Sequence, residues 1–335
     1  MTFDERAAWL DRELGVGRSF DMVGRSLVIA GRRARLWVVN GYAYDAILER
    51  MIALWQALPE GQEISGLHSF VEKYVSASDA EVETDGHEAV RQVLAGKTLL
   101  ILEGFPGSIL MDVKQFPLRA VAEPDTSKVL RGSHDGFGES IMKNAALLRR
   151  RIRSTDLTLE HLTVGGRSAA DVALCYMQGE ADGKLLAELR EKLEKIDVRS
   201  VSMSQESLME AMAPKQWYNP FPKVRYTERP DVATACLMEG DILVMVDNSP
   251  SVMIFPVSVF RFAEEVNDYY FPPLTGSYLR FVRLIVLLLT IFVTPLWYLL
   301  AKSPGGIHEH LKFLLIQDDY FVPLIFTAFI GGIHH

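Results

Sequence analysis

The sequence predicts a mixed α/β protein, with layers of helices and strands arranged in two lobes, followed by a transmembrane helix. Strand-like and helix-like patterns alternate through most of the chain, one unit of that pattern occurs twice, and a long apolar run follows them. We therefore expect a first α/β lobe over residues 1–120 and a second over residues 121–275. A transmembrane helix over 279–302 and a loop with a partial second hydrophobic segment over 303–335 complete the expected organisation.

The first lobe is expected to begin with a β-hairpin. Residues 26–30 and 35–42 have the apolar character of strands, and the link between them is short enough for a hairpin. Residues 44–57 then show the apolar spacing of a helix. A further helix from about residue 85, a strand at 98–102, a proline-containing turn and a strand at 108–113 end the lobe.

The last unit of the first lobe recurs in residues 232–254. Both copies show a helix, a glycine suited to end it, an apolar strand, an acidic residue, a proline turn and another apolar strand. The paired positions are Gly96 with Gly240, Glu103 with Asp247, and Pro106 with Pro250. The shared order indicates two related lobes that face each other across a cleft.

A third unit lies between the two copies. We expect a helix over residues 137–152, strands near 159–164 and 171–178, and an amphipathic surface helix over 181–196. Ser133 or Asp135 is the expected N-cap of the first of these helices. Thr227 is the expected cap of the helix that contains Pro230 in its first turn.

The clearest feature of the sequence is the uncharged apolar run over residues 284–301. Its length suits a helix that crosses about 30 Å of hydrocarbon. Arg280 and Arg283 precede the run, which favours a cytoplasmic N-terminal domain. A buried core helix is the alternative interpretation. A second apolar stretch, over residues 321–333, is too short to span the membrane alone.

Composition restricts the classes of function. The formal net charge of −8 argues against a general nucleic-acid-binding protein. The two cysteines, Cys175 and Cys236, lie far apart in apolar segments, so we expect buried free thiols in a reducing compartment. Residues 1–18 mix acidic and basic residues with apolar ones and do not resemble a secretion signal.

Recognised catalytic and cofactor motifs are missing from the sequence. It contains neither a phosphate-binding loop of the GxxxxGK[ST] type nor a GxSxG nucleophile elbow. The glycines of GVGRSF at 15–20 lack the rest of a dinucleotide fingerprint. His308 and His310 flank Glu309 but do not form an HExxH metal motif. We therefore expect neither enzymatic activity nor a metal or other cofactor.

A basic cluster ends the helix expected over residues 137–152. Arg149, Arg150, Arg151 and Arg153 stand where the negative end of a helix dipole favours cations. Capping of the helix and pairing with nearby acids is the simpler interpretation. Contact with anionic lipid head groups or with a neighbouring subunit is the functional one.

Two polar strings carry a resemblance to a known family. They are EPDT…RG…DGF…NAALLRRRIR within residues 123–153, and YNPFP…RYTERPD…EG…VD.SP within residues 218–250. Together they resemble the A-subunit family of GerA-type spore germinant receptors, over roughly residues 15–300. The SFD…VNG pattern at 19–41 and the string RYTERPDVA are most similar to the stage V sporulation protein AF branch of that family.

The resemblance implies a protein of the spore inner membrane that acts in germination, with its N-terminal domain on the cytoplasmic side. Family membership implies homo-oligomers, contacts with other germination membrane proteins and with lipid, and a contribution to ion release through a channel. No nucleic-acid partner is expected. One alternative is a ligand-sensing module that binds a small molecule in the cleft between the lobes. Another is an inactive truncated remnant, since the further membrane helices of the family do not follow the first.

The charged members of the two strings are the candidate functional residues. We expect them to form salt links between lobes or between subunits. They are Glu123, Asp125, Arg131, Asp135, Arg149, Arg150, Arg151, Glu228, Arg229 and Asp231.

Overall fold

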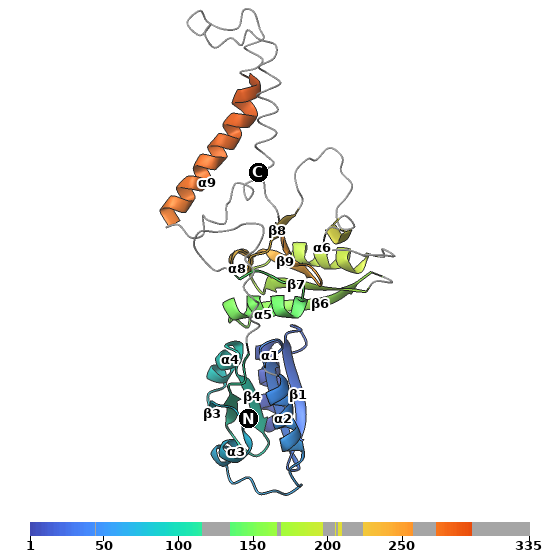
Figure 1. Cartoon of the computed structure of the whole chain (residues 1–335), viewed down its shortest axis with the longest axis vertical. Coiled ribbons are helices and arrows are strands. Elements are labelled where there is room, and N and C mark those ends of the chain that lie inside the picture. The colour runs from blue at the N-terminus through green and yellow to red at the C-terminus, as the bar shows by residue number, and fades with distance from the viewer. Residues whose placement is uncertain are drawn as a thin grey trace, which may run out of the picture. The chain divides into compact units, whose positions relative to one another are not determined.

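The computed structural model describes residues 1–43, 45–115, 135–165, 169–196, 205, 207–209, 224–256 and 273–296. The chain forms two compact units, Met1–Ser258 and Val259–His335. The first unit contains two antiparallel sheets with helices packed on them, and the described part of the second unit is a single helix (Figure 1). The predicted class, a two-lobed α/β fold followed by an apolar helix, is therefore confirmed.

The first lobe is built on a sheet in the order β1-β2-β4-β5-β3. Its strands are β1 (Met22–Ile29), β2 (Arg32–Val39), β3 (Ala80–Glu83), β4 (Thr98–Leu102) and β5 (Ser108–Met111). Its helices are α1 (Phe3–Leu14), α2 (Asp45–Gln56), α3 (Leu67–Tyr74) and α4 (Gly86–Leu94). All the strand pairs described in this sheet are antiparallel.

The central strand β4 has the sequence TLLIL because helices cover both faces of the sheet. Successive side chains of a strand point to opposite faces. Leu100 and Leu102 belong to the apolar cluster formed with α2 and α3. Leu99 and Ile101 belong to the cluster formed with α1 and α4. A strand buried on both sides therefore reads as a continuous apolar run.

The second lobe repeats this topology, with the order β6-β7-β9-β10-β8. Its strands are β6 (Leu157–Val164), β7 (Ala170–Met177), β8 (Arg225–Thr227), β9 (Ile242–Val246) and β10 (Val252–Phe255). Its helices are α5 (Ile141–Arg151), α6 (Gly183–Glu194) and α8 (Pro230–Met238). Since β6 to β10 occupy the places of β1 to β5 in the same order, the predicted internal repeat is confirmed.

The two lobes also share backbone conformations at the paired positions. Gly96 and Gly240, which follow α4 and α8, have φ angles of 106° and 88°. Gly104 after β4 has φ 91°, and Asn248 at the matching place after β9 has φ 63°. Asparagine is among the few residues other than glycine that enter this left-handed region readily. The turn is thus preserved although its residue type differs.

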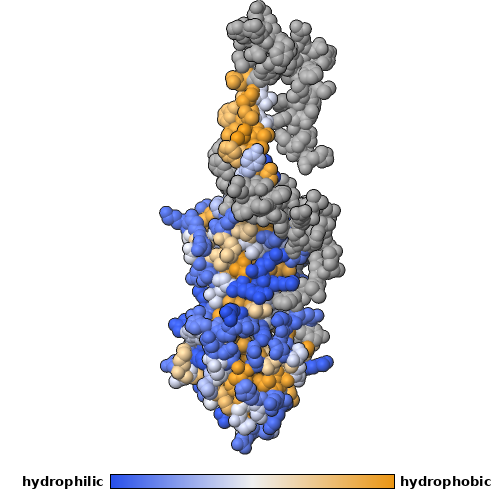
Figure 2. Space-filling model, turned by 90° about the vertical axis from the view of Figure 1, so that its left-hand side faces the viewer, coloured by the Kyte–Doolittle hydropathy of each residue, from blue (hydrophilic) through white to orange (hydrophobic). Residues whose placement is uncertain are grey.

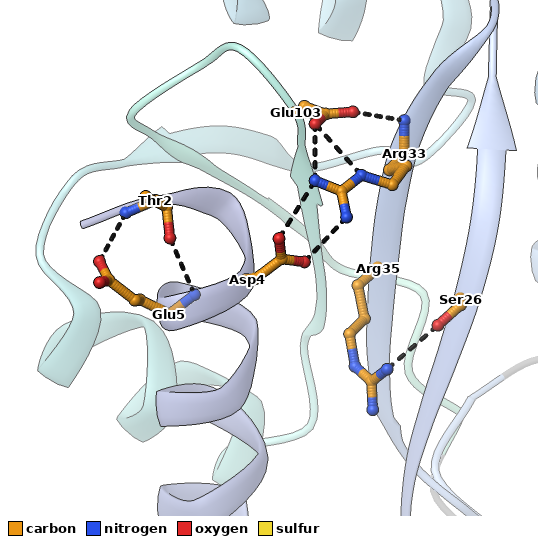
Figure 3. A network of polar contacts seen from close by, with 7 residues as sticks. All are labelled: Thr2, Asp4, Glu5, Ser26, Arg33, Arg35 and Glu103. Carbon is orange, nitrogen blue, oxygen red and sulfur yellow. Dashed lines mark hydrogen bonds and ion pairs between the residues drawn. The ribbon is translucent and has the colours of Figure 1, made fainter.

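In the first lobe, Glu103 ties the turn after β4 to β2 and α1 (Figure 3). Its carboxylate accepts hydrogen bonds from the Arg33 side chain at 2.7 and 3.1 Å and from the Arg33 backbone amide at 3.2 Å. These hydrogen bonds lower the pKa of Glu103. The Arg33 guanidinium also binds Asp4 at 2.9 Å. All three side chains are exposed, so solvent screens these ion pairs and they contribute little to stability.

The described part of the second unit is α9 (Pro273–Leu288), which continues into a π-helical turn at Leu289–Val293. Residues Ser277–Leu296 are long and apolar enough to cross a membrane, with a mean hydropathy of 2.1. Their side chains are largely exposed, and the described surface of α9 is mostly apolar in Figure 2. A buried core helix would not have this exposure within the chain.

Some elements differ from the prediction. The helix expected over residues 137–152 begins only at Ile141, and the first hairpin strand begins at Met22 rather than at residue 26. Helices α1 and α3 and strands β3 and β8 were not predicted from the sequence. For α1 a signal was present, because Thr2 and Glu5 form a reciprocal capping box at its start (Figure 3).

Candidate functional site at the lobe junction

Helix α5 connects the lobes because residues from its middle to its C-terminal end contact the first lobe. Ala146 lies in the apolar cluster formed by α1 and α4. Its carbonyl accepts a hydrogen bond of 3.1 Å from the Tyr42 hydroxyl, and Tyr42 is 1% exposed. Burial is the main cause that raises the pKa of Tyr42, so the phenol stays protonated and continues to donate.

The centre of the junction is an ion pair between Arg149 of α5 and Asp21, which directly precedes β1. The Arg149 Nε lies 2.7 Å from Asp21 Oδ2, and the exposed fractions of the two side chains are 1% and 0%. Asp21 Oδ1 accepts a second bond from Arg149 Nη2 at 3.1 Å. The guanidinium therefore binds the carboxylate with two parallel bonds, the geometry that favours arginine over lysine.

The remaining donors of Arg149 are satisfied by groups around it. They bind the carbonyls of Ser154 and Leu157 at 2.9 and 3.0 Å and the hydroxyl oxygen of Ser19 at 3.2 Å. The Ser19 hydroxyl in turn donates to Asp21 at 2.5 Å. Burial of a charged pair is tolerated when it is fully hydrogen-bonded, and loss of one partner then leaves an uncompensated charge. The pair therefore fixes how α5 meets the first lobe.

A backbone contact reinforces the junction. The amide of Phe20 donates to the carbonyl of Leu159 in β6 at 3.0 Å, and the Leu159 amide donates to the Ser19 hydroxyl at 3.0 Å. Residues 19–20 of the first lobe thus cover part of the outer edge of β6. An edge strand has unpaired backbone groups, and coverage of this kind satisfies them. We call Ser19, Asp21, Tyr42, Ala146 and Arg149 the lobe junction.

Several of the candidate motif residues gather around α5 and α8. Arg151 binds Asp135 at 2.6 Å, with both side chains partly exposed. The backbone carbonyl of Glu228 accepts a 2.8 Å bond from the amide of Phe137. The two polar strings that carry the family resemblance therefore meet in the fold, although they are far apart in the sequence.

Arg229 lies at the start of α8 and is completely buried. Its guanidinium binds Asp231 at 2.7 Å, and the Asp231 side chain is 15% exposed. Asp231 stands in the first turn of α8, where the helix dipole favours a negative charge. This pair lies within the second lobe and joins neighbouring residues rather than two lobes.

Two predicted helix caps are wrong. Asp135 binds Arg151 and does not cap α5, because α5 begins at Ile141 and its N-cap position is Ser140. The Ile141 amide instead bonds to Asp247 at 3.0 Å. Thr227 is not the N-cap of α8, since that position is Arg229; the Thr227 hydroxyl accepts from the Arg229 amide at 3.2 Å. Ser133 lies outside the described residues.

The other candidates divide into two groups. Arg150 is exposed, and it has interactions with neighbouring groups. Glu123, Asp125 and Arg131 lie outside the described residues, so their predicted salt links stay predictions. Arg149 is buried, and its pair with Asp21 agrees with the simpler interpretation that the basic cluster pairs with nearby acids.

Sequence reasoning missed Ser19, Asp21 and Asp247 as partners of the motif residues. A signal for the first two was present. The pattern Ser-x-Asp precedes β1 at Ser19 and Asp21, and it recurs before β6 at Ser154 and Asp156. In both copies the serine hydroxyl donates to the carboxylate, at 2.5 and 2.9 Å. The internal repeat therefore pointed to these serine–aspartate pairs.

A groove of about 500 Å³ lies beside the lobe junction. Arg18 of the first lobe borders it, and Thr158, Tyr176 and Gln178 of the second lobe line it. Arg18 donates to the Gln178 side chain at 2.9 Å. Among the described residues, no group of three or more His, Cys, Asp or Glu side chains is arranged to hold a metal ion.

The comparisons with known proteins agree with the resemblance seen in the motifs. The family model for Bacillus/Clostridium GerA spore germination proteins matches residues 9–333. Stage V sporulation protein AF of Bacillus subtilis (strain 168) is 34% identical over 97% of this chain and 66% of that protein. The uncharacterized membrane protein YfkQ of the same organism is 29% identical over 67% of this chain and 43% of that protein. The chain thus spans two thirds or less of the length of these relatives.

A solved structure has the same fold. It is the crystal structure of the N-terminal domain of the A subunit of the Bacillus megaterium spore germinant receptor GerK3. The similarity has a TM-score of 0.58 at 25% sequence identity and covers 77% of this chain and 96% of the solved chain.

Proposed function

Since the chain belongs to the Bacillus/Clostridium GerA family of spore germination proteins, we propose that it acts in germination as a non-enzymatic protein of the spore inner membrane. In this proposal it assembles with further copies and with other germination membrane proteins, and the assembly contributes to ion release. One observation carries the proposal. The match over residues 9–333 includes the two lobes and the apolar helix Ser277–Leu296 in one chain.

The proposed arrangement places the lobes on the cytoplasmic side and α9 in the membrane. The name of YfkQ as a membrane protein and the exposure of α9 both support the membrane location. Free, buried Cys175 and Cys236 are consistent with a reducing compartment for the lobes. The buried Arg149–Asp21 pair supports a role for the two lobes as a single compact unit in the assembly.

Spores that lack the chain test the germination role. The fall in optical density after exposure to germinants should be slower in these spores than in the parent strain. Reintroduction of the wild-type chain should restore it. Equal germination kinetics in the parent and the deletion strain would refute the role. Fractionation and sizing of the detergent-solubilised chain test assembly separately, with a defined oligomer expected and a monomer contradicting it.

Small-molecule sensing is the second candidate, and the groove beside the lobe junction favours it. The groove combines the cation of Arg18 with the ring and hydroxyl of Tyr176 and the apolar side chain of Leu186. Such a lining suits a small amphiphilic molecule. Calorimetric titration of the chain with amino acids and sugars should show heat that the Arg18→Ala variant lacks. Absence of heat across both ligand classes would exclude this candidate.

A further inference from the structure

The π-helical turn at Leu289–Val293 interrupts the apolar helix within its candidate span. Most spans satisfy all backbone groups within the helix, because hydrocarbon provides no partners. A π-turn keeps intrahelical bonds but shifts them by one residue, to the i→i+5 pattern, and such turns often occur at functional sites. Pro295 follows two residues after this turn. The structure therefore places an irregular backbone segment within the candidate membrane span Ser277–Leu296.

Pro295 has no amide hydrogen to donate. In α-helical geometry this amide would bind the carbonyl of Ile291, and in π-helical geometry it would bind that of Thr290. The carbonyl of Thr290 or of Ile291 therefore lacks the hydrogen bond that an amide at position 295 would donate, and both carbonyls belong to one turn of the helix. A backbone group left unsatisfied in hydrocarbon costs several kcal/mol. Another donor must therefore reach this side of the helix.

Two hydroxyls lie on the same side. Thr290 and Thr294 are four residues apart and so share a face of the helix. Within the part of the chain that the structure describes, neither side chain makes a hydrogen bond, and Thr294 is exposed. Two hydroxyls beside a carbonyl without its amide partner supply the two to four polar contacts that an ordered water needs.

We propose that the face of α9 carrying Thr290 and Thr294 lines a water-filled path through the membrane assembly. This inference rests on the proposed role in ion release and names the residues of the span that face the path. Phe292 lies between the two threonines in sequence and is 65% exposed on its own side of the helix. It marks the face that contacts lipid or protein. The threonine face receives water, which satisfies the backbone at the π-turn.

Cysteine labelling tests the inference on the full chain in its membrane. Cys175 is completely buried, and burial raises the pKa of its thiol; Cys236 is also buried. The wild-type chain should therefore give a low background with a charged, water-soluble methanethiosulfonate reagent. The test variants are Thr290→Cys and Thr294→Cys, and Phe292→Cys is the control at the same depth.

We expect both threonine variants to label at least about tenfold faster than Phe292→Cys. The thiolate is the reactive form, and a difference of one pKa unit between a thiol in water and a thiol in an apolar environment changes the thiolate fraction about tenfold. Slow labelling at all three positions would overturn the inference, and so would equal labelling of Phe292→Cys. Membrane fractionation and the oligomer size of each variant show that it has assembled. Because labelling requires no ion flux, failure here leaves the proposed germination role intact, and failure of that role leaves the labelling result interpretable.

A second pair of variants connects the face to function. Thr290→Val with Thr294→Val preserves shape and removes both hydroxyls, whereas Thr290→Ser with Thr294→Ser retains them. In spores that depend on this chain, ion release should fall at least about tenfold in the valine pair, as for loss of about 1.4 kcal/mol, and stay near wild type in the serine pair. Equal ion release from the two pairs would contradict a role for these hydroxyls in the path.

Discussion

The guanidinium of Arg149 lies 2.7 Å from the carboxylate of Asp21, and the two side chains are 1% and 0% exposed. They are 128 residues apart in the sequence and belong to different lobes. The same arginine also bonds the carbonyls of Ser154 and Leu157. This one side chain therefore connects the end of α5, the segment before β1 and the segment that leads into β6.

Asp21→Asn should destabilise the chain strongly, because it leaves the Arg149 charge buried without its counter-charge. Breakage of a buried pair costs about 3–5 kcal/mol. Asp135→Asn is the matched control. Its partner Arg151 is 25% exposed, and such a pair contributes about 0–1 kcal/mol. Urea unfolding followed by tryptophan fluorescence measures both losses. Equal losses would contradict a special role for the buried pair.

Asp247→Ala should destabilise α5, because the Asp247 carboxylate accepts the hydrogen bond of the Ile141 amide at 3.0 Å. Loss of a helix cap costs about 0.5–2 kcal/mol. Ser140→Ala changes the N-cap position itself, where the side chain makes no capping bond, and should cost much less. The free energies of unfolding of the two variants show which side chain caps α5. A greater cost for Ser140→Ala would show that the cap is assigned wrongly.

Gly240→Ala should be more destabilising than Gly61→Ala. The two residues have similar φ angles of 88° and 85°, so the strain of about 1–2 kcal/mol from a left-handed backbone is common to both. A Cβ at position 240 would lie 2.8 Å from the backbone oxygen of Glu180, whereas one at position 61 meets nothing within 4 Å. Thermal unfolding of the pair isolates this contact. Equal melting temperatures would contradict it.

Cys175 should resist modification in the folded chain and react on unfolding. Burial raises the pKa of this thiol, so the folded state holds its proton at pH values where the unfolded thiol, with a pKa of about 8.5, loses it. Stability from this group is therefore complete below about pH 8.5 and declines as pH rises further.

Unfolding free energies at neutral and alkaline pH measure this decline. In Cys175→Ala the alkaline loss of stability should be smaller than in the wild type, although the cavity lowers stability at every pH. An unchanged difference between the two pH values would refute the assignment. Rapid thiol modification of the native wild type would do the same.

Sequence reasoning succeeded where local pattern determines structure. The strand, turn and strand of β4 and β5, and those of β9 and β10, were predicted because apolar runs and turn residues specify them directly. The prediction that Cys175 and Cys236 are buried free thiols is also confirmed. The helix α1 was not predicted, although the sequence contains the residues of its capping box, Thr2 and Glu5.

The partners of the motif residues could not be predicted in the same way. The sequence marks Arg149 as one of several arginines but does not show which of them turns inward. That choice depends on the contact of α5 with Tyr42 and on the bond from Arg149 to the Leu157 carbonyl at the start of β6, which bring Asp21 within reach. Asp247 was paired correctly with Glu103 as a repeated acid, but its cap of α5 has no counterpart in the first lobe, where Glu103 binds Arg33.

Ion release from germinating spores tests the central claim most directly. Release of monovalent cations into the medium would be followed over time in the parent strain, in spores without this chain, and in spores with the wild-type chain restored. The proposed function predicts slower or smaller release without the chain and full recovery on restoration. Identical release in all three strains would contradict a role in germination ion release.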